Sequence, residues 1–179
     1  DGVINAGALI AFEKGRSWPR KSTREKLEQV VHWKKGTIEK LRDVGARVHL
    51  IGDGDITGVI NCAKPETGID MYVGSGGAPE GVLAATALKC VGGQFQGRLV
   101  IRNDDERSRA ERAGIGELKR RYTLGELVSD HALFVAVGVT PGSLVGGVSF
   151  SGGNVQAHAL ILNSATQTKF ELTIKQPER

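Results

Sequence analysis

A glycine-rich run, Gly74-Ser75-Gly76-Gly77-Ala78-Pro79-Glu80-Gly81, most limits the folds open to this sequence. It follows a short apolar run, Ile69 to Val73, and precedes an alanine- and leucine-rich helical pattern, Val82 to Val91. In the order strand, glycine-rich turn, helix, backbone N–H groups and a helix N-terminus can face an anion. Glu80 would repel that anion unless a cation lay between them. The segment therefore indicates metal-assisted phosphate chemistry.

The length allows one domain with its own core, or a fragment of something larger, because the chain has 179 residues. It begins at Asp1 without a methionine, which fits a truncated or processed chain. Its 25 glycines are about twice the usual share, which favours tight turns and close backbone approaches.

The charge balance favours small anionic ligands over nucleic acid. The net charge is +4, and the basic residues of 14–40 and 98–121 are mixed with acids. Aromatic residues make up 5% and do not interleave with the basic runs, so we expect no nucleic-acid partner. No apolar run approaches 18 residues, so we expect no membrane span.

The cysteines and histidines do not form recognisable metal or catalytic motifs. Cys62 and Cys90 lack metal-ligand spacing, and each lies beside apolar residues, which predicts reduced, buried thiols in a cytoplasmic protein. The four histidines share no spacing, so we interpret them as structural or surface residues: His32, His49, His131 and His158.

Periodicity and turn residues predict an α/β layered domain with a mixed sheet. Helices are expected from Ser22 to Val44 with Gly45 after the end, and over Ile56–Ala63, Val82–Val91 and Leu124–Ser129. The charged segment Asn103–Lys119 fits either a solvated helix or an excursion. Strands are expected over Ala46–Ile51, Ile69–Val73, Phe95–Ile101, Val148–Phe150 and Gln156–Leu162, the last two joined at Gly152-Gly153.

Three further segments complete this prediction. The continuous apolar run Ala132–Val139 is typical of a central strand buried on both faces. Residues Asp1 to Phe12 fit either a helix or an irregular lead-in, and Thr168 to Lys175 fit either a final strand or a terminal helix.

Asp53-Gly54-Asp55 is a second candidate site. It follows the predicted strand Ala46–Ile51, and α/β sheets place their ligands at such strand ends. The two carboxylates could bind a metal or accept hydrogen bonds from sugar hydroxyls. Alternatively, Asp55 caps the helix that begins at Ile56, and both roles could hold at once.

A dinucleotide-binding interpretation of the glycine-rich run is weaker. Gly74-x-Gly76 fits the start of a G-x-G-x-x-G motif, but Pro79 stands where the third glycine belongs. No acidic residue ends the following strand, where Arg98 to Arg102 is basic. A nucleotide-binding α/β domain remains an alternative.

The residues around the glycine-rich run closely resemble the class II fructose-1,6-bisphosphatases, which include cyanobacterial enzymes that also use sedoheptulose-1,7-bisphosphate. The resemblance rests on 72–85, 87–93 and 96–99, and on Gly45-Ala46-Arg47-Val48 and Asp53-Gly54-Asp55 upstream. Downstream, Leu133 to Thr140 and Asn163-Ser164 resemble the family's closing strands. It covers about residues 38–175.

This resemblance implies the layered αβαβα fold of the metal-dependent, lithium-sensitive sugar phosphatases, of which the chain would hold only the C-terminal portion. It divides the chain into an N-terminal lead-in and helix, 1–37, and a C-terminal sugar-phosphatase domain, 38–179. The implied activity is hydrolysis of the 1-phosphate of fructose-1,6-bisphosphate with Mn²⁺ or Mg²⁺, in gluconeogenesis, glycerol metabolism or carbon fixation. We expect a homo-oligomer.

By motif, the resemblance makes Glu80 a metal ligand, Gly77 a backbone contact to substrate, and Asp53, Gly54 and Asp55 the substrate-binding loop. It identifies no catalytic residue in this chain. The sequence departs from the family at Val31-His32-Trp33, where the family has a Lys/Arg-Pro-Arg segment, and residues 1–44 contain no recognisable match to the family's other metal ligands.

We therefore expect the chain alone to bind divalent metal poorly and to lack phosphatase activity. The alternative is a non-catalytic sugar-phosphate-binding or structural protein derived from the enzyme.

Overall fold

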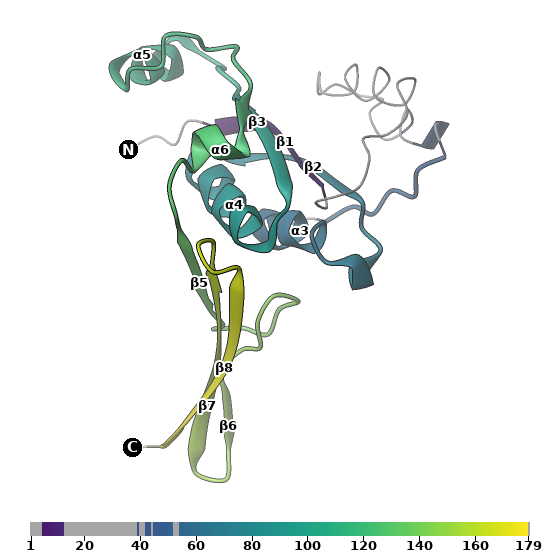
Figure 1. Cartoon of the computed structure of the whole chain (residues 1–179), viewed down its shortest axis with the longest axis vertical. Coiled ribbons are helices and arrows are strands. Elements are labelled where there is room, and N and C mark those ends of the chain that lie inside the picture. The colour runs from purple at the N-terminus through teal and green to yellow at the C-terminus, as the bar shows by residue number, and fades with distance from the viewer. Residues whose placement is uncertain (1–4, 13–38, 40–41, 44, 52–53, 179) are drawn as a thin grey trace.

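The computed structural model describes residues 5–12, 39, 42–43, 45–51 and 54–178. They form two four-stranded sheets with helices α3 (Asp55–Asn61) and α4 (Ala78–Val91) between them (Figure 1). The α/β character predicted from the sequence is therefore confirmed. Every described strand pair is antiparallel, so the predicted mixed sheet is not found within these ranges.

The first sheet contains β1 (Asn5–Phe12), β2 (Met71–Gly77), β3 (Gln94–Leu99) and β4 (Tyr122–Thr123), in the order β2-β1-β3-β4. Strand β1 lies between β2 and β3 and is antiparallel to both. The helix or irregular lead-in predicted for Asp1–Phe12 is thus wrong over 5–12. The strand is formed by pairing with two distant segments, which a local sequence pattern does not reveal.

Helices α3 and α4 confirm two predicted helices, with a short 3-10 helix, η1 (Pro65–Thr67), after α3. Helix α4 ends at Gly92, as predicted. The N–H groups of Gly92 and Gly93 both donate to the carbonyl oxygen of Leu88, at 2.8 and 2.9 Å. Gly92 has φ of 85°, a left-handed conformation that glycine adopts without a steric cost.

The helix layer is buried on both sides. On the side of the first sheet, Val59 and Leu88 are fully buried and pack in one cluster with Phe95 of β3. On the other side, Ile60 packs with residues of the second sheet, including Phe134. Alanines on α4 belong to both clusters: Ala84 and Ala85 to the first, Ala87 to the second. Small side chains on both faces of α4 let the two sheets approach it closely.

The second sheet contains β5 (Leu133–Val137), β6 (Ser149–Ser151), β7 (Asn154–Asn163) and β8 (Thr168–Pro177). Strand β7 pairs with β8 along its whole length, and with β5 and β6 along its other edge. The predicted β6–β7 hairpin is confirmed, with φ of 57° at Gly152 and 71° at Gly153. At the C-terminal end, the strand alternative is confirmed and the helix alternative is wrong.

Two predictions about strands are wrong: one predicted strand does not form, and another is not buried on both faces. Residues 46–51 form no strand and pair with no described strand, and Leu50 is 67% exposed. Strand β5 is not buried on both faces, because Leu133, Val135 and Val137 are 58–62% exposed.

The predicted helix of Ser22 to Val44 lies mostly outside the described residues. Within it, Glu39, Arg42 and Asp43 are helical, and Gly45 is left-handed, as expected after a helix end.

The charged segment after β3 forms α5 (Asp104–Arg112), which extends away from the sheets (Figure 1). Asn103 caps it, because its side-chain oxygen accepts from the N–H of Glu106 at 2.8 Å. The carboxylate of Glu106 accepts in turn from the N–H of Arg102 at 2.7 Å. These two bonds hold the first turn of α5 against the preceding residues and help to explain why a helix with few apolar residues forms here.

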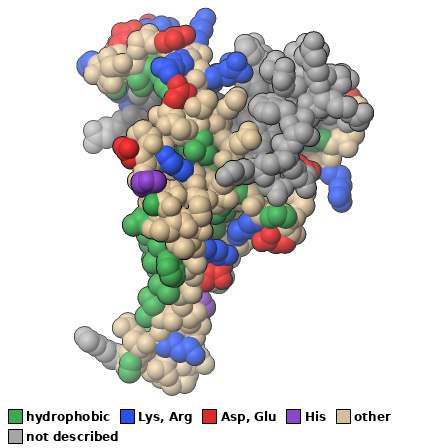
Figure 2. All heavy atoms as spheres, viewed as in Figure 1, with side chains coloured by type: hydrophobic (Ala, Val, Ile, Leu, Met, Phe, Trp, Pro, Cys, Tyr) green, Lys and Arg blue, Asp and Glu red, His purple; other side chains and the backbone are tan. Residues whose placement is uncertain are grey.

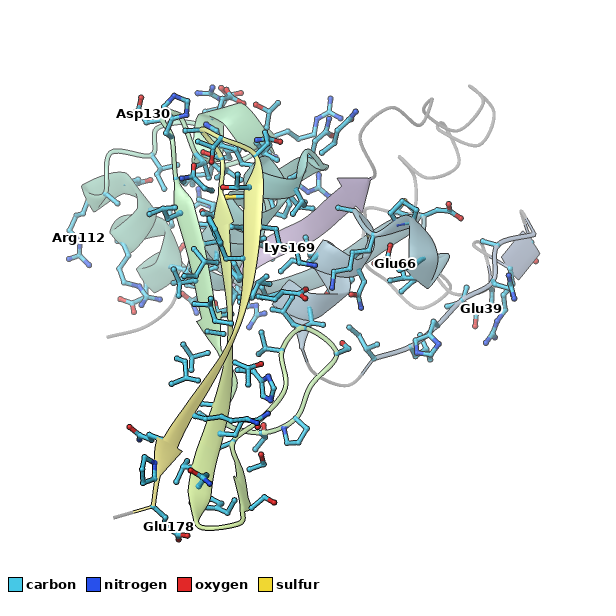
Figure 3. All side chains as sticks on the ribbon, turned by 60° about the horizontal axis from the view of Figure 1, so that its bottom comes forward. Glu39, Glu66, Arg112, Asp130, Lys169 and Glu178 are labelled. Carbon is cyan, nitrogen blue, oxygen red and sulfur yellow. The ribbon has the colours of Figure 1, made fainter. Side chains whose placement is uncertain are left out.

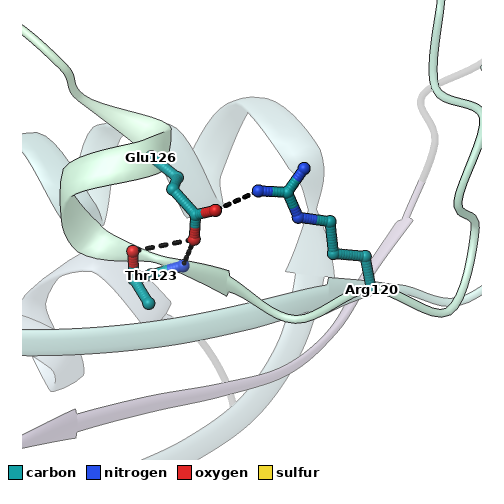
Figure 4. A network of polar contacts seen from close by, with 3 residues as sticks. All are labelled: Arg120, Thr123 and Glu126. Atoms are coloured by element: carbon teal, nitrogen blue, oxygen red, sulfur yellow. Dashed lines mark hydrogen bonds and ion pairs between the residues drawn. The ribbon is translucent and has the colours of Figure 1, made fainter.

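A similar capping box begins α6 (Leu124–Leu127) (Figure 4). One carboxylate oxygen of Glu126 accepts from the N–H and the hydroxyl of Thr123, both at 2.8 Å, and the other contacts the guanidinium of Arg120. The two Thr123 donors, followed by Arg120, lower the pKa of Glu126 to about 2. The box therefore depends on a charged carboxylate.

We predict that Leu88→Ala destabilises the protein by about 2–5 kcal/mol, because it leaves a cavity in the fully buried helix layer. The matched control is Leu83→Ala on the same helix, where the side chain is 48% exposed. It should change stability by about 0.5 kcal/mol or less. Urea denaturation measures both, and equal losses would contradict the described packing of α4.

Acid should weaken the α6 cap through Glu126. Because its folded pKa of about 2 lies below the ordinary 4.5, its contribution is present above pH 4.5 and is lost as pH falls toward 2. As the pH falls from 4.5 to 2, the denaturant concentration at the midpoint of unfolding should therefore fall less for Glu126→Gln than for the wild type. Glu111→Gln on α5 serves as a control, which should follow the wild-type profile.

Candidate functional site at the start of helix α4

The glycine-rich run is mostly strand, not turn. Residues Gly74 to Gly77 are the last four of β2, and α4 begins at the next residue, Ala78. Gly74, Gly76 and Gly77 pair with Leu9, Ala6 and Asn5 of β1. None of the glycines in this run has a positive φ angle. They are therefore required for the space that a missing side chain leaves, and not for an unusual backbone conformation. This corrects the predicted turn: the strand passes into the helix without a loop.

Two glycines make room for the ring of Tyr72. A Cβ atom on Gly74, two residues along the same strand face, would overlap the Tyr72 hydroxyl. A Cβ atom on Gly58 of α3 would lie 2.8 Å from ring atom Cε2 of Tyr72. The ring therefore lies flat over Gly74 and against α3, and a larger residue at either position would displace it.

The Tyr72 hydroxyl positions the carboxylate of Asp55. It donates to Oδ1 of Asp55 at 2.7 Å, and Oδ2 lies 2.8 Å from where a Cβ of Gly76 would stand. Burial, the hydrogen bond to Asp55 and the negative charge of Asp55 all raise the pKa of Tyr72 above its usual value. The phenol thus remains a neutral donor at physiological pH.

Asp55 is the first residue of α3, but it is not the cap. The N-cap is Gly54, with φ of 84°. The predicted capping role of Asp55 is therefore wrong, because its carboxylate turns to Tyr72 instead. The carbonyl oxygen of Gly54 accepts from the N–H of Gly58 at 2.9 Å. Asp53 lies outside the described residues.

Gly77 and Glu80 lie together at the N-terminus of α4. Gly77 is the N-cap and, being glycine, offers no side chain to cap the helix, and Pro79 is in the first turn. The first-turn N–H groups have no partner within the helix, so they are suited to bind an anion. Glu80 is exposed in the same turn, where the helix dipole stabilises a negative charge.

Glu80 can be one ligand of a hard divalent cation. Carboxylate oxygen suits Mg²⁺ and Mn²⁺, and Mg²⁺ is commonly held by one or two carboxylates together with substrate phosphates. Within the ranges that the structure describes, no three His, Cys, Asp or Glu side chains come close enough to hold a metal ion. The described residues therefore fit one metal ligand and not a complete metal centre.

Among the residues that the structure describes, the cysteines and His158 do not converge on this site; His32 lies outside them. Cys62 and Cys90 are free and buried, as predicted, and burial raises the pKa of Cys62 to about 12. Neither is a thiolate nucleophile at neutral pH. His158 lies on β7, where it contacts Gln156 and Thr173. Charged side chains labelled in Figure 3, such as Glu66, Arg112 and Lys169, are exposed on separate elements.

The sequence did not identify Tyr72 as part of the site. The sequence does contain one indication, which is the spacing of these residues. Tyr72, Gly74 and Gly76 are every second residue of β2, so they lie on one face of the strand. A ring next to two glycines on one strand face has room to lie along the strand. That pattern does not reveal the partner, Asp55, which comes from another element.

A sequence model of the family described as "Bacterial fructose-1,6-bisphosphatase, glpX-encoded" matches residues 27–174. The chain belongs to this family. The matched region includes the Asp53-Gly54-Asp55 segment, Gly77 and Glu80, and both sheets apart from β1 and the last residues of β8. The resemblance that the sequence indicated is thereby confirmed.

Three relatives carry the name D-fructose 1,6-bisphosphatase class 2/sedoheptulose 1,7-bisphosphatase. That of Crocosphaera subtropica is 39% identical over 147 residues, which is 75% of this chain and 43% of the relative. That of Microcystis aeruginosa is 37% identical with the same coverage. The second such protein of Acaryochloris marina is 37% identical over 144 residues, 73% of this chain and 41% of its own length. The chain thus spans less than half the length of these relatives.

We predict that Tyr72→Phe destabilises the protein by about 1.5–3 kcal/mol, because it leaves the Asp55 carboxylate without its phenol donor. The control is Tyr122→Phe, where the ring faces the guanidinium of Arg120 and keeps that contact. Urea denaturation at neutral pH measures both. Equal effects of the two substitutions would contradict a special role for the Tyr72 hydroxyl.

Proposed function

We propose that this chain provides the substrate-binding part of a metal-dependent sugar bisphosphatase. The reaction is hydrolysis of the 1-phosphate of fructose-1,6-bisphosphate, and of the related sedoheptulose-1,7-bisphosphate. The observation that carries the proposal is the start of α4, where Glu80 lies in the first turn and the N-cap is Gly77, which has no side chain to cap the helix. The family membership of residues 27–174 supports it.

The residues near the point where β2 meets α4 suit different parts of a sugar phosphate. The first-turn N–H groups of α4 donate to phosphate oxygens, and Gly77 lets the phosphate approach the backbone. The carboxylates of Asp53 and Asp55 repel phosphate but accept hydrogen bonds from sugar hydroxyls. We therefore place the sugar toward Asp55 at the start of α3, and the phosphate toward the start of α4.

Glu80 is proposed as one ligand of Mn²⁺ or Mg²⁺. The bound cation offsets the negative charge of the phosphate and polarises its phosphorus–oxygen bonds. Glu80 would otherwise repel the phosphate held by the same helix turn. Further ligands are expected from parts of the relatives that this chain does not match, so the chain alone should bind metal weakly.

The proposal also includes the fold, the cellular compartment and the metabolic pathway. The described sheet, helix and sheet layers suit the C-terminal portion of a layered αβαβα sugar phosphatase. A domain of residues 38–179 would supply every described strand except β1. Free thiols at Cys62 and Cys90 suit a reducing, cytoplasmic compartment. The pathway would be gluconeogenesis, glycerol metabolism or carbon fixation. Among the described residues, no helix is long and apolar enough to span a membrane.

A second candidate is a non-catalytic protein that binds sugar phosphates or has a structural role. The observation that favours it is the lack of a three-residue metal-binding group within the described ranges. Both candidates share the binding site at α4, and they differ in whether a complete metal centre forms when the remaining part of a relative is supplied.

A chimeric enzyme separates the two. Residues 38–174 of this chain would replace the corresponding part of the Crocosphaera subtropica relative, and phosphate release from fructose-1,6-bisphosphate would be measured with Mn²⁺. We expect turnover that Glu80→Gln lowers by about 100-fold or more, while Glu111→Gln on α5 has no effect. A folded chimera without turnover would favour the non-catalytic candidate.

The 179-residue chain alone should release no phosphate from fructose-1,6-bisphosphate above the buffer rate with either Mn²⁺ or Mg²⁺. The reason is that one carboxylate at the start of α4 does not make a metal centre. The same assay on the intact Crocosphaera subtropica enzyme provides the reference. Comparable turnover by the two proteins would overturn this prediction.

A further inference from the structure

The hydrogen bond between Tyr72 and Asp55 occupies one oxygen of the carboxylate and leaves the other. The phenol donates to Oδ1 of Asp55 at 2.7 Å. Within the ranges that the structure describes, this is the one hydrogen bond that the carboxylate accepts, so Oδ2 is left for a ligand. Asp55 is half-buried at the start of α3, so the protein holds its side chain where a ligand can still reach it.

The remaining oxygen, Oδ2, lies beside the start of α4. It is 2.8 Å from the point where a Cβ atom of Gly76 would stand. Gly76 directly precedes Gly77, the N-cap of α4. Because consecutive Cα atoms are about 3.8 Å apart, Oδ2 and the first turn of α4 lie within the span of one sugar phosphate.

Three glycines leave the space for this arrangement. A Cβ atom on Gly58 or Gly74 would stand within 2.8 Å of the Tyr72 side chain, and one on Gly76 would stand at that distance from Oδ2. None of the three glycines has a positive φ angle. They are therefore needed for the room that they give to the tyrosine ring and to the carboxylate.

A phenol partner leaves the negative charge on Asp55 in place. Burial, the hydrogen bond to Asp55 and the charge of Asp55 raise the pKa of Tyr72, so the phenol stays a neutral donor. A lysine or arginine partner would instead offset the charge. An ionised carboxylate only accepts hydrogen bonds, and it accepts them about twice as strongly as a neutral group. Oδ2 is therefore suited to bind a hydroxyl group and to repel a phosphate.

We propose that Tyr72 is a positioning residue that makes Asp55 a selective acceptor for a sugar hydroxyl. By holding Oδ1, it directs Oδ2 to the space over Gly76. The site then prefers a hydroxylated phosphate ester to a phosphate ester without hydroxyls. This proposal rests on the sugar-phosphate site proposed above and adds the residue that orients its carboxylate. Tyr72 acts through Asp55 and does not itself contact the ligand.

Two bisphosphates of equal charge separate hydroxyl selection from charge attraction. Figure 2 shows basic side chains at several separate places on one face of the molecule, so a bisphosphate can bind through charge alone. Fructose-1,6-bisphosphate carries hydroxyls between its phosphates, whereas hexane-1,6-diol bisphosphate carries none. Each is titrated into the 179-residue protein at one Mg²⁺ concentration. The amide NMR shifts of Ala78, Glu80 and Gly81 give both dissociation constants.

We expect the wild type to bind the sugar bisphosphate about 10-fold more tightly than the diol bisphosphate. Tyr72→Phe should remove most of this preference by weakening the sugar bisphosphate alone, whereas a disturbed fold would weaken both ligands. The matched control, Tyr122→Phe, should keep the preference, because its ring faces Arg120. In an Asp55→Ala background, Tyr72→Phe should have no further effect on the preference.

Gly76→Ala replaces Tyr72→Phe if the latter does not fold, which the dispersion of the amide spectrum checks. Its Cβ atom would stand 2.8 Å from Oδ2 and turn the carboxylate away, while Tyr72 and Asp55 are both retained. The preference should fall in the same way.

Three results would overturn the proposal. A wild type without the preference, or folded variants that keep it or that weaken both ligands equally, would exclude the role of Tyr72 and leave the phosphate site in place. If neither bisphosphate shifted the amides of α4 in the wild type at millimolar concentration, the sugar-phosphate site itself would be contradicted, and this proposal with it.

Discussion

Both sheets depend on one thin layer of helix, α3 with α4. Residues on its two sides belong to two separate clusters, so each sheet is attached to the molecule through these helices. The layer is thin because alanines and glycines occupy its contact surfaces, and Gly58 lies where the ring of Tyr72 needs space. The hydrogen bond from Tyr72 to Asp55 then fixes α3 against β2.

The same packing explains the shape of the candidate site. Because β2 passes into α4 without a loop, the N-terminus of the helix is held at the end of a paired strand. Asp55 is held beside it by Tyr72 and by the absence of a side chain on Gly76. The site is therefore one wall that combines backbone donors at the start of α4, the carboxylate of Asp55 at the start of α3, and the exposed carboxylate of Glu80.

Local patterns predicted the elements whose signals lie within them. Gly92 ended α4 as expected, and Gly152-Gly153 formed the predicted hairpin. Patterns failed where pairing with distant residues decides the structure. Strand β1 exists because two other strands lie beside it, and the apolar residues of β5 are exposed on one face although the run suggested burial on both.

The candidate site could be predicted only in part, because some of its contacts also join residues that are far apart in the sequence. The sequence placed Gly77 and Glu80 in a turn just before a helix from Val82, because glycines and a proline mark a boundary there. The helix begins earlier, at Ala78, directly after the strand. It left Asp55 as a ligand-binding residue, a helix cap or both, and the cap is wrong because the carboxylate turns to a tyrosine that is 17 positions away in the chain. Contacts over that distance depend on how α3 packs on β2, which no local spacing encodes.

The central claim is that the start of α4 binds a sugar phosphate. Amide NMR spectra of the protein, recorded during titration with fructose-1,6-bisphosphate and Mg²⁺, test it most directly. The account predicts that the largest shifts fall on the amides of Ala78, Glu80 and Gly81 and on those at the start of α3. Saturating shifts confined to other surfaces, such as the lysines of β8, or no shifts at millimolar ligand, would contradict it.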